Sequence, residues 1–403
     1  MYIRTNLGNY FFYFSFFLWY FHKVVKMTFF DTFFSDEFLM NISFVATLLL
    51  IVKIVIIDYK FFWKYYLKIS LVVSICFISV ASSGKIWYDS LFTISLFVIA
   101  AHDISLKKIC LLTSALAFAA LVTVLVTNHL GIISKTIVFE PRHRDALGFK
   151  HYSNAPFVFL GAVFSGMYAK HEKKELSYLE LLILLLINLY IYIKTDTRWI
   201  FVSVFAIVFL YVIIYKFNLY YYLNKNKKMI AVLSVFFVTS ILIIYFAVSI
   251  KYSPNSTIFH NIDIKLFNTR ISLNNRAFKE YGIHFWGNEV KYIDDGKDFF
   301  YIDSGYMQLL FNNGLIVLIM ICVAYYIIMI NAVKEENWFV FSWVIIIVIF
   351  NVMNEMIFTL ERATPLLLLF QIICKEKLVY EEGYKSRKYK SRKYKSLYYC
   401  SYF

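Results

Sequence analysis

Residues 181–214 read LLILLLINLYIYIKTDTRWIFVSVFAIVFLYVII, in which the polar stretch KTDTR separates two apolar runs. A helix needs about 20 apolar residues to cross a hydrocarbon core roughly 30 Å thick. Each run approaches that length, and the polar stretch leaves room only for a tight turn between them. The segment therefore predicts two membrane-spanning helices joined by a short turn.

Similar apolar runs recur along the whole chain of 403 residues, of which 61% are hydrophobic, and the mean hydropathy is +0.64. Soluble domains are typically about half apolar, so a membrane is the expected surrounding. We predict an all-α polytopic membrane protein with about 11–12 transmembrane helices. The first expected span is short and ends among lysines, and Met27 is an alternative start for the chain. The expected spans lie near residues 9–27, 38–57, 66–83, 87–101, 109–127, 155–169, 177–194, 199–216, 229–250, 306–330, 337–358 and 363–375.

Lysines set the expected orientation, because cytoplasmic loops carry an excess of positive charge. Lysine-rich segments at 58–68, 170–176 and 216–228 are predicted to be cytoplasmic. We expect one transmembrane domain, residues 1–380, without a removable signal peptide. The loops 128–154, 195–198, 251–305 and 359–364 would then lie outside, and 251–305 would form the one long extracytoplasmic loop.

The net charge of +15 and the five cysteines narrow the possible functions. The tail, residues 381–403, contains YKSRK twice, at 384–388 and 389–393. Such a basic cluster beside a last span is typical of binding to an anionic inner leaflet, so we expect a cytoplasmic tail and no nucleic-acid partner. The cysteines lie in apolar runs or in the tail, which predicts neither disulfides nor a metal site.

Arginines are distributed differently from lysines. All six between Arg4 and the tail fall in predicted outer segments, against the positive-inside rule. A guanidinium group binds phosphate or carboxylate through two parallel hydrogen bonds and stays charged when desolvated. The pattern therefore predicts an anionic ligand at the outer surface. These arginines are Arg142, Arg144, Arg198, Arg270, Arg276 and Arg362.

Three outer positions are chemically informative. Arg198 stands at the tight turn of KTDTR, where an ionisable residue is a functional candidate, although a simple pair with Asp196 is the alternative. Asp303 precedes a span without a basic neighbour in sequence, so desolvation would raise its pKa and suit it to act as a general base. Residues 270–281 predict a short amphipathic helix lying on the membrane, followed by Phe285 and Trp286 at the interface.

The order of these features resembles a known family. An outer loop carries R-x-x-L-G-F-x-H…N from Arg144 to Asn154, and an arginine follows at a tight outer turn. The long loop has an arginine, F-x-G ending at Gly287, and I-D-S-x-Y-x-x-L-L-x-x-x-G ending at Gly314. Residues 40–375 thus resemble Wzy-type polysaccharide polymerases, as found in capsule and exopolysaccharide clusters. These belong to the O-antigen ligase/polymerase superfamily of GT-C-fold glycosyltransferases.

The resemblance implies a substrate and a location. Oligosaccharide repeat units linked to undecaprenyl diphosphate would be polymerised at the outer face of a bacterial cytoplasmic membrane, without a cofactor or metal. Implied partners are the lipid-linked glycans, membrane lipids, and possible flippase and chain-length regulator proteins. The implied catalytic residues are Asp303, His151, Arg198 and Arg270, with Asp303 and His151 as alternative bases; the substrate-binding residues are Arg142, Arg144, Asn154, Arg276 and Tyr306; and the structural motif residues are Gly148, Phe149 and Gly287.

Three other functions remain open at this point. A ligase of the same superfamily would transfer finished glycan to another acceptor, but Asp303 stands where ligases tend to have histidine. A flippase or transporter would need charges along its spans, where this chain has little beyond Lys53 and Glu355. A non-enzymatic scaffold is the third alternative.

Overall fold

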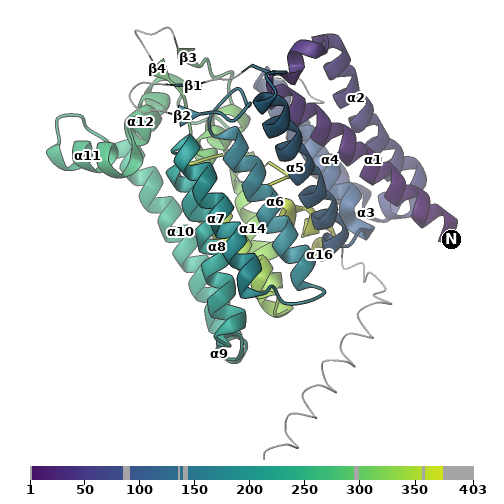
Figure 1. The fold of residues 1–403 in the computed structure, drawn as a ribbon. Coiled ribbons are helices and arrows are strands. Elements are labelled where there is room, and N and C mark those ends of the chain that lie inside the picture. The colour runs from purple at the N-terminus through teal and green to yellow at the C-terminus, as the bar shows by residue number, and fades with distance from the viewer. Residues whose placement is uncertain are drawn as a thin grey trace, which may run out of the picture.

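The computed structural model describes residues 2–84, 91–134, 137–138, 144–294, 299–355 and 359–374, and it is a bundle of helices (Figure 1). Seven helices in this part of the chain are long and apolar enough to cross a membrane. This confirms the prediction of an all-α polytopic membrane protein. The seven are α2 with its π-turn η2 (Asp36–Ile57), α3 (Tyr59–Ser82), α5 (Leu106–His129), α7 (Tyr178–Thr195), α8 with η5 (Arg198–Lys216), α10 (Lys227–Lys251) and α14 (Leu315–Lys334).

The other expected spans also contain helices, several of which are shorter than expected. Those within the bundle are α1 (Tyr2–Met27), α4 (Leu91–Ala100), α6 (Asn154–His171), α15 (Trp338–Phe350), and α16 (Leu369–Ile373) after the 3₁₀ turn η8 (Thr364–Leu368). Thr364–Ile373 is one of the helical segments below 18 residues. At 1.5 Å per residue it covers about half of a hydrocarbon core. The described helical part of the expected span 363–375 is therefore shorter than a full crossing.

The expected span 306–330 is interrupted. Helix α13 (Gly305–Gln308) continues into the π-turn η7 (Leu309–Asn313), and α14 begins only after Gly314. Gly314 has φ +90°, and a Cβ there would overlap the Phe285 carbonyl oxygen. Only glycine combines this backbone with such close packing. The break turns the chain so that the segment around Phe285 packs against the start of α14. There, Leu315 N donates a hydrogen bond to His284 O.

The connecting segments separate to the two ends of the bundle (Figure 1). One end, here called the loop end, carries two antiparallel two-stranded sheets with α11 (Thr257–Ile262) and α12 (Arg270–Tyr281). The opposite end carries α9 (Leu219–Lys225). The sheets pair β1 (Ile137–Val138) with β2 (Arg144–Asp145), and β3 (Ile293–Asp294) with β4 (Phe299–Phe300). The described parts of two segments predicted to be outer, 128–154 and 251–305, thus gather at the loop end. Residues 360–364, also predicted to be outer, are instead buried in the bundle, where Glu361 O lies against Gly161 of α6.

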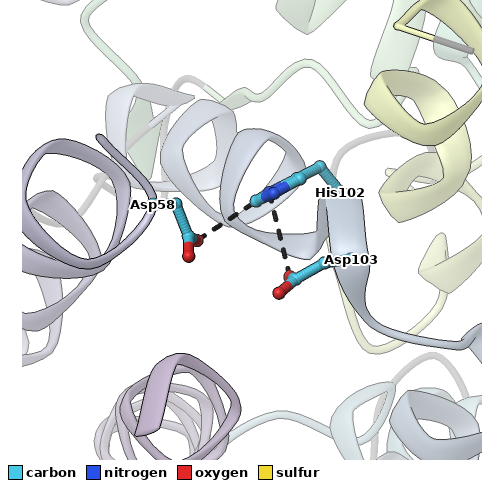
Figure 2. A group of neighbouring side chains, drawn as sticks. All are labelled: Asp58, His102 and Asp103. Atoms are coloured by element: carbon cyan, nitrogen blue, oxygen red, sulfur yellow. Dashed lines mark ion pairs between the residues drawn. The ribbon is translucent and has the colours of Figure 1, made fainter. Parts of the chain in front are cut away.

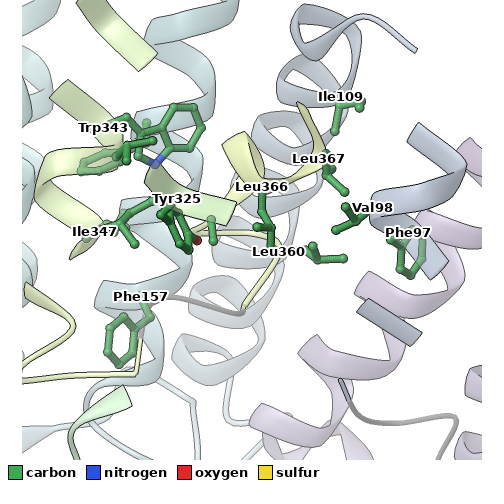
Figure 3. Close-up of a cluster of buried hydrophobic side chains, with 14 of the residues drawn as sticks. Phe97, Val98, Ile109, Phe157, Tyr325, Trp343, Ile347, Leu360, Leu366 and Leu367 are labelled. Atoms are coloured by element: carbon green, nitrogen blue, oxygen red, sulfur yellow. The ribbon is translucent and has the colours of Figure 1, made fainter. Parts of the chain in front are cut away.

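Helix α6 lies at the centre of the bundle. Nearly all of its side chains are buried, and α5 and α7 contact it. A helix that is apolar all round belongs in the interior. Gly161 lets the segment before η8 approach closely, because a Cβ there would lie 2.6 Å from the Glu361 carbonyl oxygen. Figure 3 shows the surrounding core, in which Trp343, Leu360 and Leu367 are fully buried. By contrast, α10 exposes apolar residues such as Phe236 and Ile243 along its length.

Helix α1 is part of this bundle. Its Phe12 and Phe16 are fully buried and pack edge-on against Phe97 of α4, with ring centroids 5.8 and 5.7 Å apart. Helix α1 also packs along α2 (Figure 1). Residues near the start of the chain therefore contribute to the core.

The predicted amphipathic helix at 270–281 is α12, and its buried face packs against α10. Ile271, Asn274 and Asn275 are buried against α10, where Asn274 Nδ2 donates to Tyr245 Oη (2.7 Å) and Asn275 Nδ2 to Ser249 O (2.9 Å). These amides need partners inside the protein, so α12 packs on top of the bundle. The helix is confirmed, and Ile271, from the face expected to contact lipid, is packed against protein.

Candidate functional site

The motif loop between β2 and α6 is fixed by a tight turn. Asp145 Oδ1 accepts a hydrogen bond from Leu147 N at 2.9 Å, and Leu147 and Gly148 both have positive φ, +53° and +85°. A Cβ on Gly148 would lie 2.8 Å from Asn128 Cβ. Phe149 is fully buried and forms an isolated β-bridge with Thr28. Gly148 and Phe149 therefore shape the loop, as expected for structural motif residues.

The same loop is attached to the connection between α1 and α2. Lys150 N donates to Met27 O at 2.9 Å, and the Lys150 ammonium pairs with Asp31. Asn154, the first residue of α6, donates from Nδ2 to the same Met27 oxygen at 3.4 Å. The side chain of Asn154 thus holds the start of α6 against α1, and its predicted contact with substrate stays a prediction.

Arg144, Tyr152 and His151 form a stack at the surface of the loop end. The Arg144 guanidinium carbon lies 4.2 Å from the centre of the Tyr152 ring, and the His151 and Tyr152 ring centroids are 4.0 Å apart. Arg144 Nε is buried, with no hydrogen-bond partner among the described residues. Stacking on an aromatic ring orients a guanidinium group while leaving its N–H donors available.

His151 is held through one ring nitrogen. Ser153 N, which can only donate, lies 3.3 Å from His151 Nδ1, and Ser153 Oγ lies 2.6 Å from the same nitrogen. Nδ1 therefore accepts, which puts the proton of the neutral ring on Nε2. A ring in this tautomer offers a donor at Nε2, so the geometry favours His151 as a hydrogen-bond donor rather than as the base.

Arg270 and Asp303 form a close ion pair. Arg270 is the first residue of α12, and its Nη2 lies 3.0 Å from Asp303 Oδ2. Its Nε donates to Met353 O (3.0 Å) and its Nη1 to Phe267 O (3.1 Å), so three segments of chain fix the guanidinium group. The Arg270 side chain is only 13% exposed, whereas that of Asp303 is 41% exposed. The carboxylate therefore remains accessible beside a buried cation.

Electrostatic coupling joins the stack to the ion pair. Burial raises the pKa of Asp303 above its ordinary value, while Arg270 and then His151 act in the opposite direction. Burial also lowers the pKa of His151, although its ring reaches the surface; Asp303 opposes this shift and Arg144 reinforces it. The structure thus brings Arg144, His151, Arg270 and Asp303 into one cluster from three separate segments. We call these four residues the outer cluster.

Two other predicted arginines contact acidic residues of their own segments. Arg198, the first residue of α8, is 62% exposed, and its Nε lies 3.7 Å from Asp196 Oδ1. Helix α7, which precedes this turn, contacts β2, so the turn lies beside the motif loop. Arg276 Nε lies 2.6 Å from Glu280 Oε1 one turn along α12. Arg142 lies outside the described residues.

Tyr306 and Gly287 occupy packed positions. Tyr306 is fully buried and donates from Oη to Val348 O at 2.8 Å, so its hydroxyl supports the core. Gly287 has φ +89°, and a Cβ there would overlap the Asn312 carbonyl oxygen. Its neighbour Asn288 donates from the backbone to Phe311 O at 2.7 Å. Gly287 therefore allows the long loop to close over η7.

Arg362 has a larger role in the packing than a local ion pair with its neighbour. It is 5% exposed, and its guanidinium carbon lies 3.7 Å from the centre of the Phe157 ring on α6. Its Nη1 donates to Glu355 O at 2.6 Å, and its Nε lies 3.7 Å from Glu361 Oε1. Burial lowers the pKa of Arg362, and the two glutamates oppose this shift. The sequence predicted Arg362 to be one of the outer arginines. That its side chain is buried could be learned only from the fold.

A second charged cluster lies at the opposite end of α2. Figure 2 shows Asp58, His102 and Asp103 converging, with His102 Nδ1 4.0 and 3.8 Å from the two carboxylates. Their ligand atoms lie close enough together to hold a metal ion. Lys53 Nζ already contacts the same two oxygens, Asp58 Oδ2 at 2.5 Å and Asp103 Oδ1 at 2.9 Å. A bound cation would therefore compete with this buried ammonium group.

The larger of the two best-defined cavities lies away from the outer cluster. It has a volume of about 280 Å³ and an apolar lining from α5, α6 and α7, including Phe118, Ala162 and Leu184. The Lys170–Glu180 ion pair lies at its margin.

A search for this chain among protein-family models, curated proteins and solved structures gave no match.

Proposed function

We propose that this protein is a membrane-embedded polysaccharide polymerase of the Wzy type with a GT-C-like fold. The loop end would face away from the cytoplasm of a bacterium. Its substrates would be oligosaccharide units linked to undecaprenyl diphosphate. The observation that carries the proposal is the outer cluster, in which a half-exposed carboxylate with a raised pKa pairs with the buried Arg270, and His151 links it electrostatically to the stacked Arg144.

In the proposed reaction, a hydroxyl of the acceptor glycan attacks the anomeric carbon of the donor. Asp303 takes the hydroxyl proton, and a new C–O bond forms as the bond from the anomeric carbon to the diphosphate breaks. The electron pair of that bond leaves with the lipid diphosphate. A base with a pKa raised toward the working pH suits this transfer.

The arginines would act on the leaving group. Negative charge grows on the diphosphate as its bond to the sugar breaks, and fixed guanidinium groups stabilise that charge most strongly in the transition state. Arg270 is held by two carbonyl oxygens, so it needs little reorganisation. Arg144 has N–H groups available from its stacked position, and Arg198 can reach a ligand from the exposed turn.

The test is complementation of a strain that lacks the gene, with polymer length read on a gel at matched protein level. Wild-type protein should restore long polymer, whereas Asp303→Asn should leave single repeat units and Arg270→Lys, which keeps the charge but loses the planar fork, should give less and shorter polymer. In the strain that expresses an inactive variant, accumulation of lipid-linked repeat units at the outer face of the membrane would support polymerase function. Accumulation at the inner face would indicate a flippase instead, and accumulation of finished lipid-linked polymer would indicate a ligase.

A further inference from the structure

We propose that residues 257–267, comprising α11 and the π-turn η6 (Asp263–Phe267), form an arm that binds the membrane surface at the loop end. In Figure 1 this arm extends sideways from the top of α10, away from the bundle. The expected amphipathic helix, α12, is packed against protein. The arm therefore replaces it as the element that contacts lipid.

Three aliphatic residues of the arm are exposed, whereas Phe267 packs on Tyr245 of α10. Ile258 is 72% exposed and Leu266 59% exposed, and Ile264 is exposed as well. Exposed aliphatic surface costs about 25 cal/mol per Å² in water, and a six-residue helix is not stable there by itself. The arm therefore requires a covering surface. On α10, the helix that precedes the arm, Ile243 and Ile250 are also exposed.

The charges of the arm favour anionic lipid over a protein partner. Lys251 and Lys265 are exposed, as is His260. The only acidic residue between 251 and 270 is Asp263, and it is buried. Basic and apolar side chains on a short segment beside a span are typical of binding to a membrane interface containing anionic headgroups.

The arm is also connected to the outer cluster. The Asp263 carboxylate accepts hydrogen bonds from Ile271 N (2.8 Å) and Ser272 N (3.1 Å), and so satisfies free donors at the start of α12. Arg270 is the residue immediately before them and donates to Phe267 O within the arm. Docking of the arm on lipid would therefore fix the position of Arg270.

Site-directed spin labelling tests the docking without any activity measurement. A nitroxide is attached at Ile258→Cys or Leu266→Cys in a full-length protein lacking its five native cysteines and reconstituted in nanodiscs of phosphatidylcholine and phosphatidylglycerol. Both labels should be more accessible to oxygen, which partitions into lipid, than to a water-soluble nickel chelate. A label at Lys279→Cys, an exposed position on α12, is the matched control and should show the reverse.

Two outcomes would overturn the proposal. Labels at 258 and 266 that favour the nickel chelate would place the arm in water. Labels inaccessible to both reagents would place it against protein, either a second copy or another partner.

Hydrogen exchange tests the link between the arm and α12. In the Ile258→Asp/Leu266→Asp variant, faster exchange at the backbone amides of Ile271 and Ser272 would support the link. Exchange no faster than in the control variant Lys279→Gln would refute it.

Discussion

Replacing Arg270 by methionine should raise the pKa of Asp303. Burial already holds that pKa above its ordinary value, and Arg270, with Nη2 3.0 Å from Oδ2, is the main opposing influence. Methionine keeps much of the side-chain length but removes the charge and every donor. Burial would then act on the carboxylate with only His151 opposing it.

The size of the shift follows from distance and exposure. An opposite charge within hydrogen-bonding distance shifts a carboxyl pKa by about 1–3 units. The Asp303 side chain is 41% exposed, so solvent screening favours the lower end of that range. We expect a shift of about 1 unit, equivalent to about 1.4 kcal/mol. A base works only when deprotonated, so activity is present above its pKa and is lost as the pH falls through it.

The assay is the initial rate of polymer formation in proteoliposomes at saturating labelled substrate, measured across pH. The rate falls at acid pH as Asp303 becomes protonated, and in the Arg270→Met variant this acid limb should lie about one pH unit higher than in wild type. At a pH below the Asp303 pKa of both proteins, the variant should therefore be about tenfold slower for this reason alone. Arg270→Lys, which keeps the charge, should shift the limb less. A limb that stays in place or moves to lower pH would refute this reasoning.

Three further substitutions test separate parts of the structure. Asp303→Asn should lower turnover by about 10²–10⁴-fold, whereas His151→Gln, which keeps a donor, should have the smaller effect; equal losses of turnover in the two variants would contradict the assignment of Asp303 as the base. Gly287→Ala should lower the melting temperature more than Gly131→Ala, because both residues have positive φ but a Cβ at 131 meets nothing within 4 Å; thermal unfolding in detergent compares them, and similar losses would argue against close packing at Gly287. Lys53→Met should lower the free energy of unfolding by roughly 3 kcal/mol, because it leaves the carboxylates of Asp58 and Asp103 without their buried cation. Chemical denaturation measures this change. As the control, stability should recover when Asp58 and Asp103 are also changed to asparagine.

The sequence was sufficient to predict that the helices exist, but not where several of them begin and end. Apolar runs long enough to cross a membrane predict helices wherever they occur, since backbone polar groups in lipid must be paired within the segment. The run at 306–330 contains a break that hydropathy does not register, because Gly314 is a single residue whose backbone geometry depends on Phe285 packing against it. Hydropathy also does not show that the expected span 363–375 begins with the 3₁₀ turn η8 and not with a regular α-helix.

The outer cluster was predicted in composition but not in geometry. Loop position and side-chain chemistry single out Arg144, Arg270 and Asp303, and the family resemblance adds His151. The segments that carry these residues are far apart along the chain. That His151 lies near Asp303 depends on how the motif loop packs against the segment before α13. The Arg276–Glu280 pair, by contrast, follows from the i,i+4 spacing of a helix.

By itself, the sequence determined that this chain forms membrane helices and that six of its arginines lie in the loops or at the turns outside the apolar runs. Both follow from local composition, because the cost of placing a residue in lipid is set mainly by its own side chain and backbone. Only the tertiary structure decided which of those arginines are buried, which carboxylate they pair with, and that the arm rather than α12 exposes its apolar face. Those outcomes depend on distances between segments remote in sequence, which no local pattern specifies.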